Sequence, residues 1–220
     1  MYLPYLGIDL REHFKMNKQG KAALRPATQS VVLYVLLRDA ENLCLTLLAK
    51  ELGYSIMTMS RAFDELESSG LGQTLTSRRE RHFQLVGTKR VIWDKAQPLL
   101  RTPVKKRFAI EKKTDSEICF PQTGLSALSR YSTLSEPKSA SIAISGIDWT
   151  ILKQGYQAID SVEDEIGTTI VEIWNYNPAL FADNGLVDRL SLYLSLRDSQ
   201  DERVQLALEQ MIRDISWLKD

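Results

Sequence analysis

Residues 46–70 read TLLAKELGYSIMTMSRAFDELESSG, a pattern of two short helices joined by a tight turn. The hydroxyl of Thr46 is expected to cap the first helix, and Gly53 is expected to end it in the left-handed conformation that glycine adopts easily. After a turn at Tyr54, Ser55 is expected to cap the second helix. Two helices at this spacing are typical of a helix-turn-helix.

The second of these helices has two faces of different character. Apolar side chains recur every three or four residues and predict one buried stripe, made of Ile56, Met59, Phe63 and Leu66. The opposite face carries Met57, Thr58, Arg61 and Glu65. In a DNA major groove, Arg61 can read a guanine and the Thr58 methyl group can contact a thymine. An amphipathic helical hairpin in an all-α domain is the alternative.

The segment that follows predicts a β-hairpin with a cationic tip. Residues 71–75 and 82–86 alternate in polarity and flank a turn that contains Arg78, Arg79 and Arg81. Upstream, residues 28–38 predict a third helix with Val31, Val32, Val35 and Leu36 as its apolar face. Such a set is typical of a winged helix-turn-helix, in which the hairpin contacts the DNA backbone or the minor groove.

Charge is unevenly distributed along the chain, although 28 basic residues balance 28 acidic ones. Residues 73–113 contain 12 basic and 3 acidic side chains, whereas residues 114–220 contain 8 basic and 17 acidic ones. A basic block beside the hairpin is what phosphate contacts require, although any single lysine in it can belong to an ordinary solvated surface. The residues expected to contact DNA are Ser55, Met57, Thr58, Arg61, Arg78, Arg79, Arg81, Lys105, Lys106 and Arg107.

Catalytic and metal-binding motifs are not evident in the sequence. Its two cysteines, Cys44 and Cys119, lie in apolar runs and are interpreted as small core residues, and neither His13 nor His82 stands in a zinc-ligand spacing. The acidic run of residues 163–165 is interpreted as a solvated face. We therefore expect no cofactor, no metal site and no enzymatic activity.

No apolar run is long enough to span a membrane, and the amino-terminal residues lack the apolar core of a signal peptide. A cytoplasmic protein is expected.

The remaining periodicities predict a mixed second half. Helices are expected over residues 88–100, 123–131, 187–197 and 199–218, the last with a capping box formed by Ser199 and Glu202. Strands are expected over residues 107–110, 117–120, 140–144 and 168–174. The fold class is then α+β: a leader over residues 1–26, a winged helix-turn-helix over 27–100 and an α+β domain over 101–220.

Four phrases carry a family resemblance: GYSIMTMSRAFDELESSGL, RVIWDKAQPLL, TGLSALSRYSTLSEP and VDRLSLYLSLRDSQDERVQLALE. Together they resemble the MarR-like winged-helix proteins related to the AbiEi antitoxins of type IV toxin-antitoxin pairs. The resemblance implies a repressor of its own operon, with double-stranded operator DNA as partner, an antitoxin-like domain over residues 101–220 and a neighbouring nucleotidyltransferase-type toxin. A homodimer on DNA would suit a short inverted repeat.

Two other functions remain open at this stage. One is a MarR-like repressor whose carboxy-terminal domain senses a small molecule, and the other is an interaction scaffold whose basic face docks an acidic partner. Because the basic and acidic parts of the chain meet near Lys113, a fragment that ends near Thr102 is expected to fold and to bind DNA alone.

Overall fold

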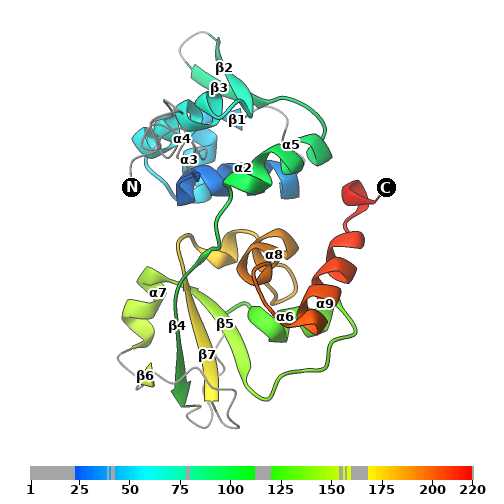
Figure 1. Cartoon of the computed structure of the whole chain (residues 1–220). Coiled ribbons are helices and arrows are strands. Elements are labelled where there is room, and N and C mark those ends of the chain that lie inside the picture. The colour runs from blue at the N-terminus through cyan, green and yellow to red at the C-terminus, as the bar shows by residue number, and fades with distance from the viewer. Residues whose placement is uncertain are drawn as a thin grey trace, which may run out of the picture.

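The computed structural model describes residues 23–38, 40, 43–77, 80–111, 120–153, 156, 158–159 and 168–219. Two groups of elements follow one another along the chain, joined by a short connection at residues 100–103 (Figure 1). We call them the amino-terminal half and the carboxy-terminal half. Helices and two small sheets give an α+β architecture, as the sequence predicted.

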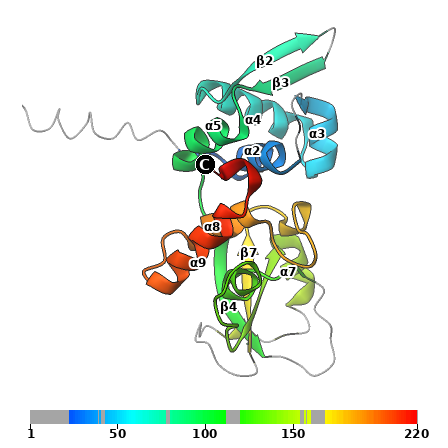
Figure 2. The ribbon, with the colours of Figure 1, turned by 90° about the vertical axis from the view of Figure 1, so that its right-hand side faces the viewer.

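The amino-terminal half packs helices beneath a small antiparallel sheet. Its helices are α2 (Pro26–Arg38), α3 (Leu45–Leu52), α4 (Ile56–Ser68) and α5 (Lys89–Ala96), the last continued by the 3-10 turn η1 (Gln97–Leu99). Its strands are β1 (Leu43–Cys44), β2 (Gly72–Ser77) and β3 (Glu80–Leu85), in the order β1-β3-β2. The β2–β3 hairpin projects from the end of this half (Figures 1 and 2). Strand β1 was not predicted, because a pair of residues carries no alternation.

Turn chemistry explains where α3 and α4 begin and end. Gly53 has a φ of 71° and ends α3, and the Ser55 hydroxyl accepts a hydrogen bond of 3.1 Å from the Thr58 amide at the start of α4, both as predicted. The predicted cap at Thr46 is wrong. Helix α3 begins at Leu45, so the N-cap position falls on Cys44 and has no side-chain hydrogen bond.

The carboxy-terminal half is built on a mixed sheet of order β5-β7-β4-β6. Strand β7 (Thr168–Trp174) pairs in parallel with β5 (Ala140–Ser145) and antiparallel with β4 (Val104–Glu111), which also pairs with the short β6 (Ala158–Ile159). The helices are α6 (Gly124–Tyr131), α7 (Gly146–Leu152), α8 (Arg189–Leu196) and α9 (Glu202–Arg213), with 3-10 turns η2 (Pro178–Leu180) and η3 (Ser216–Leu218). Most of the expected strand over residues 117–120 lies outside the described residues.

Strand alternation separates two layers on this sheet. Ile142, Ile144 and Val171 belong to a small cluster that packs against Trp149 of α7, whose ring centroid lies 4.3 Å from that of Phe108. The intervening residues, among them Ala143, contribute to a larger cluster that includes residues of α6 and α8. Figure 1 shows α7 on one side of the sheet and α6 and α8 on the other.

The last α-helix starts differently from the prediction. Asp201, and not a Ser199–Glu202 box, caps α9: its carboxylate accepts a hydrogen bond of 2.9 Å from the Arg203 amide. Ser199 instead accepts one from the Asp201 amide. The helix buries Val204, Leu208 and Met211.

The two halves share one hydrophobic cluster, which runs from α2 and α4 through Trp93 of α5 to α8 and α9. Leu24, assigned to the leader, belongs to it, and its amide donates a 2.9 Å hydrogen bond to the Leu99 carbonyl. The described carboxy-terminal end returns to α5 (Figures 1 and 2), where the guanidinium of Arg90 donates to the Leu218 carbonyl. The halves are therefore packed together and not merely linked.

Candidate nucleic-acid interface

Helix α4 presents an exposed surface at its amino-terminal end. The exposed fractions of Ile56 and Met57 are 59% and 64%, and Arg61 is also exposed one turn later. Among the described residues, none accepts a hydrogen bond from the Arg61 guanidinium or pairs with its charge. We call Ser55, Ile56, Met57, Thr58 and Arg61 the α4 surface.

The buried side of α4 holds this surface in place. Met59, Ala62, Phe63 and Leu66 are buried, and the Phe63 ring lies 5.2 Å from the Phe83 ring of the hairpin. The prediction that Ile56 belongs to this buried stripe is wrong. Ala62 fills the apolar face in its place, and Ile56, as the first residue of the helix, lies beyond the edge of the core.

Glu65 does not belong to the α4 surface, contrary to the sequence prediction. Its carboxylate accepts hydrogen bonds from the Thr28 hydroxyl and from the Arg25 amide, so it faces α2. The Glu65 carboxylate is therefore engaged by the start of α2. Ser55 and Thr58 form a small polar patch at the start of the helix, where their hydroxyl oxygens lie 2.8 Å apart.

The hairpin lies close to α4, but its described arginine turns inward. Arg81 donates hydrogen bonds to the Ser60 hydroxyl at 2.7 Å and to the Asp64 carboxylate at 2.5 Å. Side chains alternate between the two faces of β3, and Arg81 lies on the same face as Phe83 and Leu85, which are buried. Arg81 therefore braces the hairpin on α4. The predicted contacts Arg78 and Arg79 lie outside the described residues.

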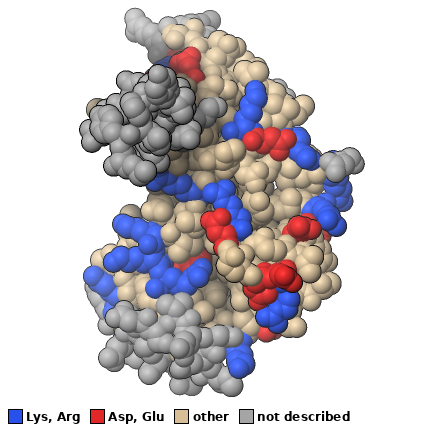
Figure 3. All heavy atoms as spheres, viewed as in Figure 1, with Lys and Arg blue, Asp and Glu red and all other residues tan. Residues whose placement is uncertain are grey.

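The remaining predicted cations lie in the other half of the molecule. Lys105 and Lys106 are exposed on β4, next to an open depression of about 530 Å³ whose lining includes Trp149 of α7. Figure 3 shows Lys and Arg side chains gathered over this part of the carboxy-terminal half. The sequence placed these cations beside the hairpin, but β4 begins a separate sheet.

Arg107 of β4 is committed to an internal ion pair. It donates two hydrogen bonds to Glu172, one of them 3.1 Å long, and the Glu172 side chain is only 1% exposed. The second carboxylate oxygen of Glu172 accepts from the Thr123 hydroxyl at 2.9 Å and from the Trp174 indole at 3.1 Å. A buried carboxylate needs these partners, so the first role of Arg107 is structural.

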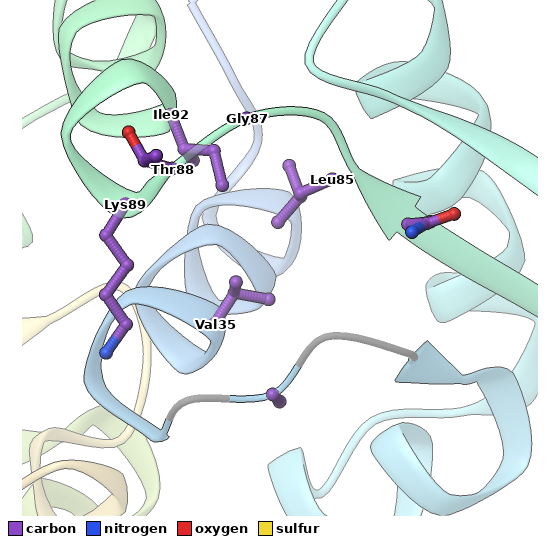
Figure 4. A pocket seen from close by; sticks show the side chains of 8 residues that line it. Val35, Leu85, Gly87, Thr88, Lys89 and Ile92 are labelled. Carbon is purple, nitrogen blue, oxygen red and sulfur yellow. The ribbon is translucent and has the colours of Figure 1, made fainter.

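A second depression of about 490 Å³ opens between α2, the end of β3 and the start of α5. Val35, Leu85 and Ile92 supply apolar walls, and Thr88 and Lys89 supply polar atoms at its edge (Figure 4). The sequence offered no indication of it, because its walls come from three separate segments. It lies in the amino-terminal half and not in the domain where a ligand site was considered.

Three residues that the sequence analysis kept apart meet beside the hairpin. Cys44 of β1 and Glu80 and His82 of β3 place one ligand-type atom each within 4.8 Å of one another. The sequence analysis interpreted Cys44 as a core residue, but its side chain is half-buried. Cys119 and the acidic run of residues 163–165 lie outside the described part of the chain.

No protein family, no curated protein and no solved structure matches this chain. In the described ranges, none of the helices has the length and apolar character needed to cross a lipid bilayer.

Proposed function

We propose that this protein is a DNA-binding transcriptional repressor, in which α3 and α4 form a helix-turn-helix and the β2–β3 hairpin serves as its wing. The observation that carries the proposal is the α4 surface. The amino-terminal end of this well-packed helix carries the polar side chains of Ser55 and Thr58 and two exposed apolar side chains. It also carries Arg61, which has no partner among the described residues. The recognition helix of a helix-turn-helix contacts base edges through its amino-terminal residues.

Charge supports the same assignment. Asp64, the acidic residue one turn after Arg61, is paired with Arg81, and Glu65 faces α2. A phosphate backbone that approaches the α4 surface therefore meets an Asp64 charge that Arg81 balances and a Glu65 carboxylate that is turned toward α2. By contrast, the acidic excess of residues 114–220 is better suited to contacts other than DNA.

The family resemblance adds a biological role to this proposal. We infer that the repressor acts on its own operon in the cytoplasm and that it is the antitoxin of a type IV pair, opposite a nucleotidyltransferase-type toxin. Expression of the full chain together with a nucleotidyltransferase encoded next to it should restore the growth that the toxin alone arrests. An unrelated neighbouring gene, or no restored growth, would argue against the antitoxin role and leave the repressor role intact.

The decisive experiment for DNA binding is an electrophoretic shift with the DNA upstream of the gene and with a shuffled fragment of the same length. We expect preferential binding to the upstream DNA, with an affinity that falls as salt rises. Arg61→Ala should cost about 1–3 kcal/mol of operator binding and relax preference at one base pair. Arg213→Ala, an exposed arginine at the end of α9, is the matched control and should bind like the wild type. Equal binding of both fragments at every salt concentration would refute the proposal.

The depression between α2, β3 and α5 supports a second candidate, a repressor that responds to a small ligand. Its walls join the helix that supports α4 to the segment that follows the hairpin, so an occupant would contact both. In that case a compound that raises the melting temperature should also change operator affinity, and Val35→Trp, which fills the depression, should abolish both effects. Stabilisation without a change in DNA binding would speak against this candidate.

A further inference from the structure

The pairing of β1 with β3 places three metal-ligand side chains on one face of the small sheet. Cys44 lies directly opposite His82 in the antiparallel register, and Glu80 precedes His82 by two residues on the same strand. Directly paired residues, and residues two apart on a strand, point to the same face of a sheet. Backbone pairing therefore directs the side chains of Cys44, Glu80 and His82 to one face of the sheet.

Core packing on the opposite face fixes this arrangement. Leu43 pairs with Phe83, and both side chains are buried against the helices. A one-residue slip of β1 along β3 would expose these two side chains, so the register that aligns Cys44 with His82 is strongly specified. The three ligand-type residues thus stand on a preorganised frame.

The distances between the donor atoms are compatible with a shared ion. The His82 Nε2 atom lies 3.8 Å from a Glu80 carboxylate oxygen, and the Cys44 Sγ atom lies 3.6 Å from the same oxygen. The first separation is too long for a hydrogen bond, whereas at the second the Cys44 thiol can donate a weak hydrogen bond to the carboxylate, which a metal ion would replace. In a tetrahedral zinc site, with bonds of about 2.0–2.3 Å, neighbouring donor atoms are about 3.3–3.8 Å apart.

Exposure leaves one side of the site open. Cys44 and His82 are half-buried, whereas the Glu80 side chain is 57% exposed. A thiolate, an imidazole and a carboxylate are all good zinc ligands, and three of them leave the fourth tetrahedral position for water. The Thr46 hydroxyl lies 3.1 Å from the Cys44 sulfur, where it can donate a hydrogen bond to the thiolate and orient it.

We infer that Cys44, Glu80 and His82 bind a divalent zinc-class metal ion with three protein ligands. The ion bridges β1 and β3 and so ties the start of α3, which follows Cys44 directly, to the hairpin. This departs from the sequence-based interpretation that the chain has no metal site. The inference does not depend on the proposed function, because metal binding can be measured without DNA.

The test uses the full-length protein, reduced and freed of metal, titrated with Co²⁺ as a spectroscopic probe. We expect one equivalent to produce the visible absorption of a four-coordinate ion together with a thiolate-to-cobalt charge-transfer band, and Zn²⁺ to displace it. Zn²⁺ should also raise the melting temperature, because a ligand that binds only the folded state stabilises it.

Variants identify the ligands. Cys44→Ser should abolish the charge-transfer band, and Glu80→Gln and His82→Gln should each weaken Co²⁺ binding by at least about tenfold, since even the loss of a group that orients a ligand costs that much. The chain provides matched controls in its other cysteine and its other histidine: Cys119→Ser and His13→Gln should leave the spectrum unchanged.

Circular dichroism of each variant separates loss of ligands from loss of fold. If Cys44→Ser does not fold, the two β3 variants decide, because Glu80 and His82 lie on the solvent side of their strand. Absence of the band in the wild-type protein would overturn the inference. So would a band that survives in Cys44→Ser and disappears in Cys119→Ser.

Discussion

Arg61 and Arg81 are both arginines beside the same helix, yet the structure gives them different surroundings. Arg61 projects from the exposed side of α4, whereas Arg81 follows the inward positions of β3 and meets Ser60 and Asp64. Residue type alone does not distinguish these two arginines. Strand alternation explains why Arg81 turns inward, and the proposed base contact therefore rests on Arg61.

Arg107 and the neighbouring Lys105 and Lys106 of β4 should differ in how much they contribute to the stability of the fold. Arg107→Ala leaves the buried Glu172 carboxylate without its countercharge, so we expect a loss of about 3 kcal/mol in the free energy of unfolding, the lower end of the range for a broken buried pair because the arginine is partly exposed. Lys105→Ala and Lys106→Ala should change it by less than about 0.5 kcal/mol. Urea denaturation of the three variants measures the difference.

A compensating variant tests the cause of that loss. Arg107→Met combined with Glu172→Gln removes both charges and should recover much of the lost stability. If the double variant is no more stable than Arg107→Met alone, an unpaired buried charge is not what destabilises the fold.

Asp188 allows a prediction about pH. It caps α8 through a 2.8 Å hydrogen bond from the Ser191 amide, while its other oxygen has no hydrogen-bond partner in the described structure. Burial raises the pKa of this carboxyl from 3.8 to about 6, against the opposing effect of the hydrogen bonds from Ser191. Between these two values the folded protein holds a proton that the unfolded chain has released, so the contribution of Asp188 to stability is lost as pH rises from about 4 to about 6.

Asp188→Asn keeps a capping oxygen and removes the ionisation. At pH 7 the variant should be more stable than the wild type by up to about 3 kcal/mol, and the difference should vanish near pH 4. Asp198→Asn, at an exposed position two residues after α8, is the control. Thermal denaturation across this pH range provides the measurement, and a difference that does not change with pH would contradict the explanation.

At the scale of elements, helix and strand positions were largely predictable, but their exact faces and ends were not. The spacing of Met59, Phe63 and Leu66 identified α4, yet the same spacing could not tell that Ile56 lies outside the core or that Glu65 meets α2. Such details depend on which segment packs alongside. Helix α3 begins one residue before the position that a Thr46 cap requires, and at the start of α9 Asp201 caps the helix while Ser199 bonds to the Asp201 amide.

The hairpin contains an element-level constraint at Gly72. A Cβ atom on this residue would lie 2.3 Å from the Gln84 carbonyl oxygen and 2.7 Å from the Phe83 ring. Gly72→Ala should therefore force β2 away from β3 and cost about 1–3 kcal/mol of stability, as overpacking does. Gly146→Ala, at the start of α7, meets no atom within 4 Å and should be tolerated. Equal denaturation midpoints for the two variants would show that β2 and β3 can accommodate the added methyl group without a loss of stability.

At the scale of the molecule, the packed halves change the expectation about fragments. Trp93 of α5 stacks edge-on against Tyr193 at 5.9 Å, and Arg197 donates hydrogen bonds to the carbonyls of Gln97 and Leu100. A fragment that ends at Thr102 loses all of these partners. The sequence suggested that it would fold alone, because charge divides the chain so clearly. Contacts between residues a hundred positions apart leave no periodic signal, and the shared cluster was therefore not predictable.

We expect the fragment ending at Thr102 to bind a hydrophobic dye and to melt with low cooperativity, because its Trp93 and Leu100 are uncovered. In the full chain, Arg197→Ala should lower the melting temperature, whereas Arg213→Ala, whose guanidinium pairs with Glu209 within α9, should not. A fragment with a sharp transition and no dye binding would restore the picture of two independent domains.

The central position of β7 also bears on how the chain reaches its folded state. Its register joins Thr168 to Glu111 and Trp174 to Val104. Among the described residues, β4 therefore pairs only with β6 and β7, both of which lie far along the chain. In the amino-terminal half, by contrast, the hairpin and the α3–α4 pair form between close neighbours. Closing a long loop costs conformational entropy, and pairings between distant segments therefore form slowly. The pairing of β4 with β7 is thus the step that we expect to set the refolding rate, and substitutions at this seam should alter folding speed more than those in the hairpin.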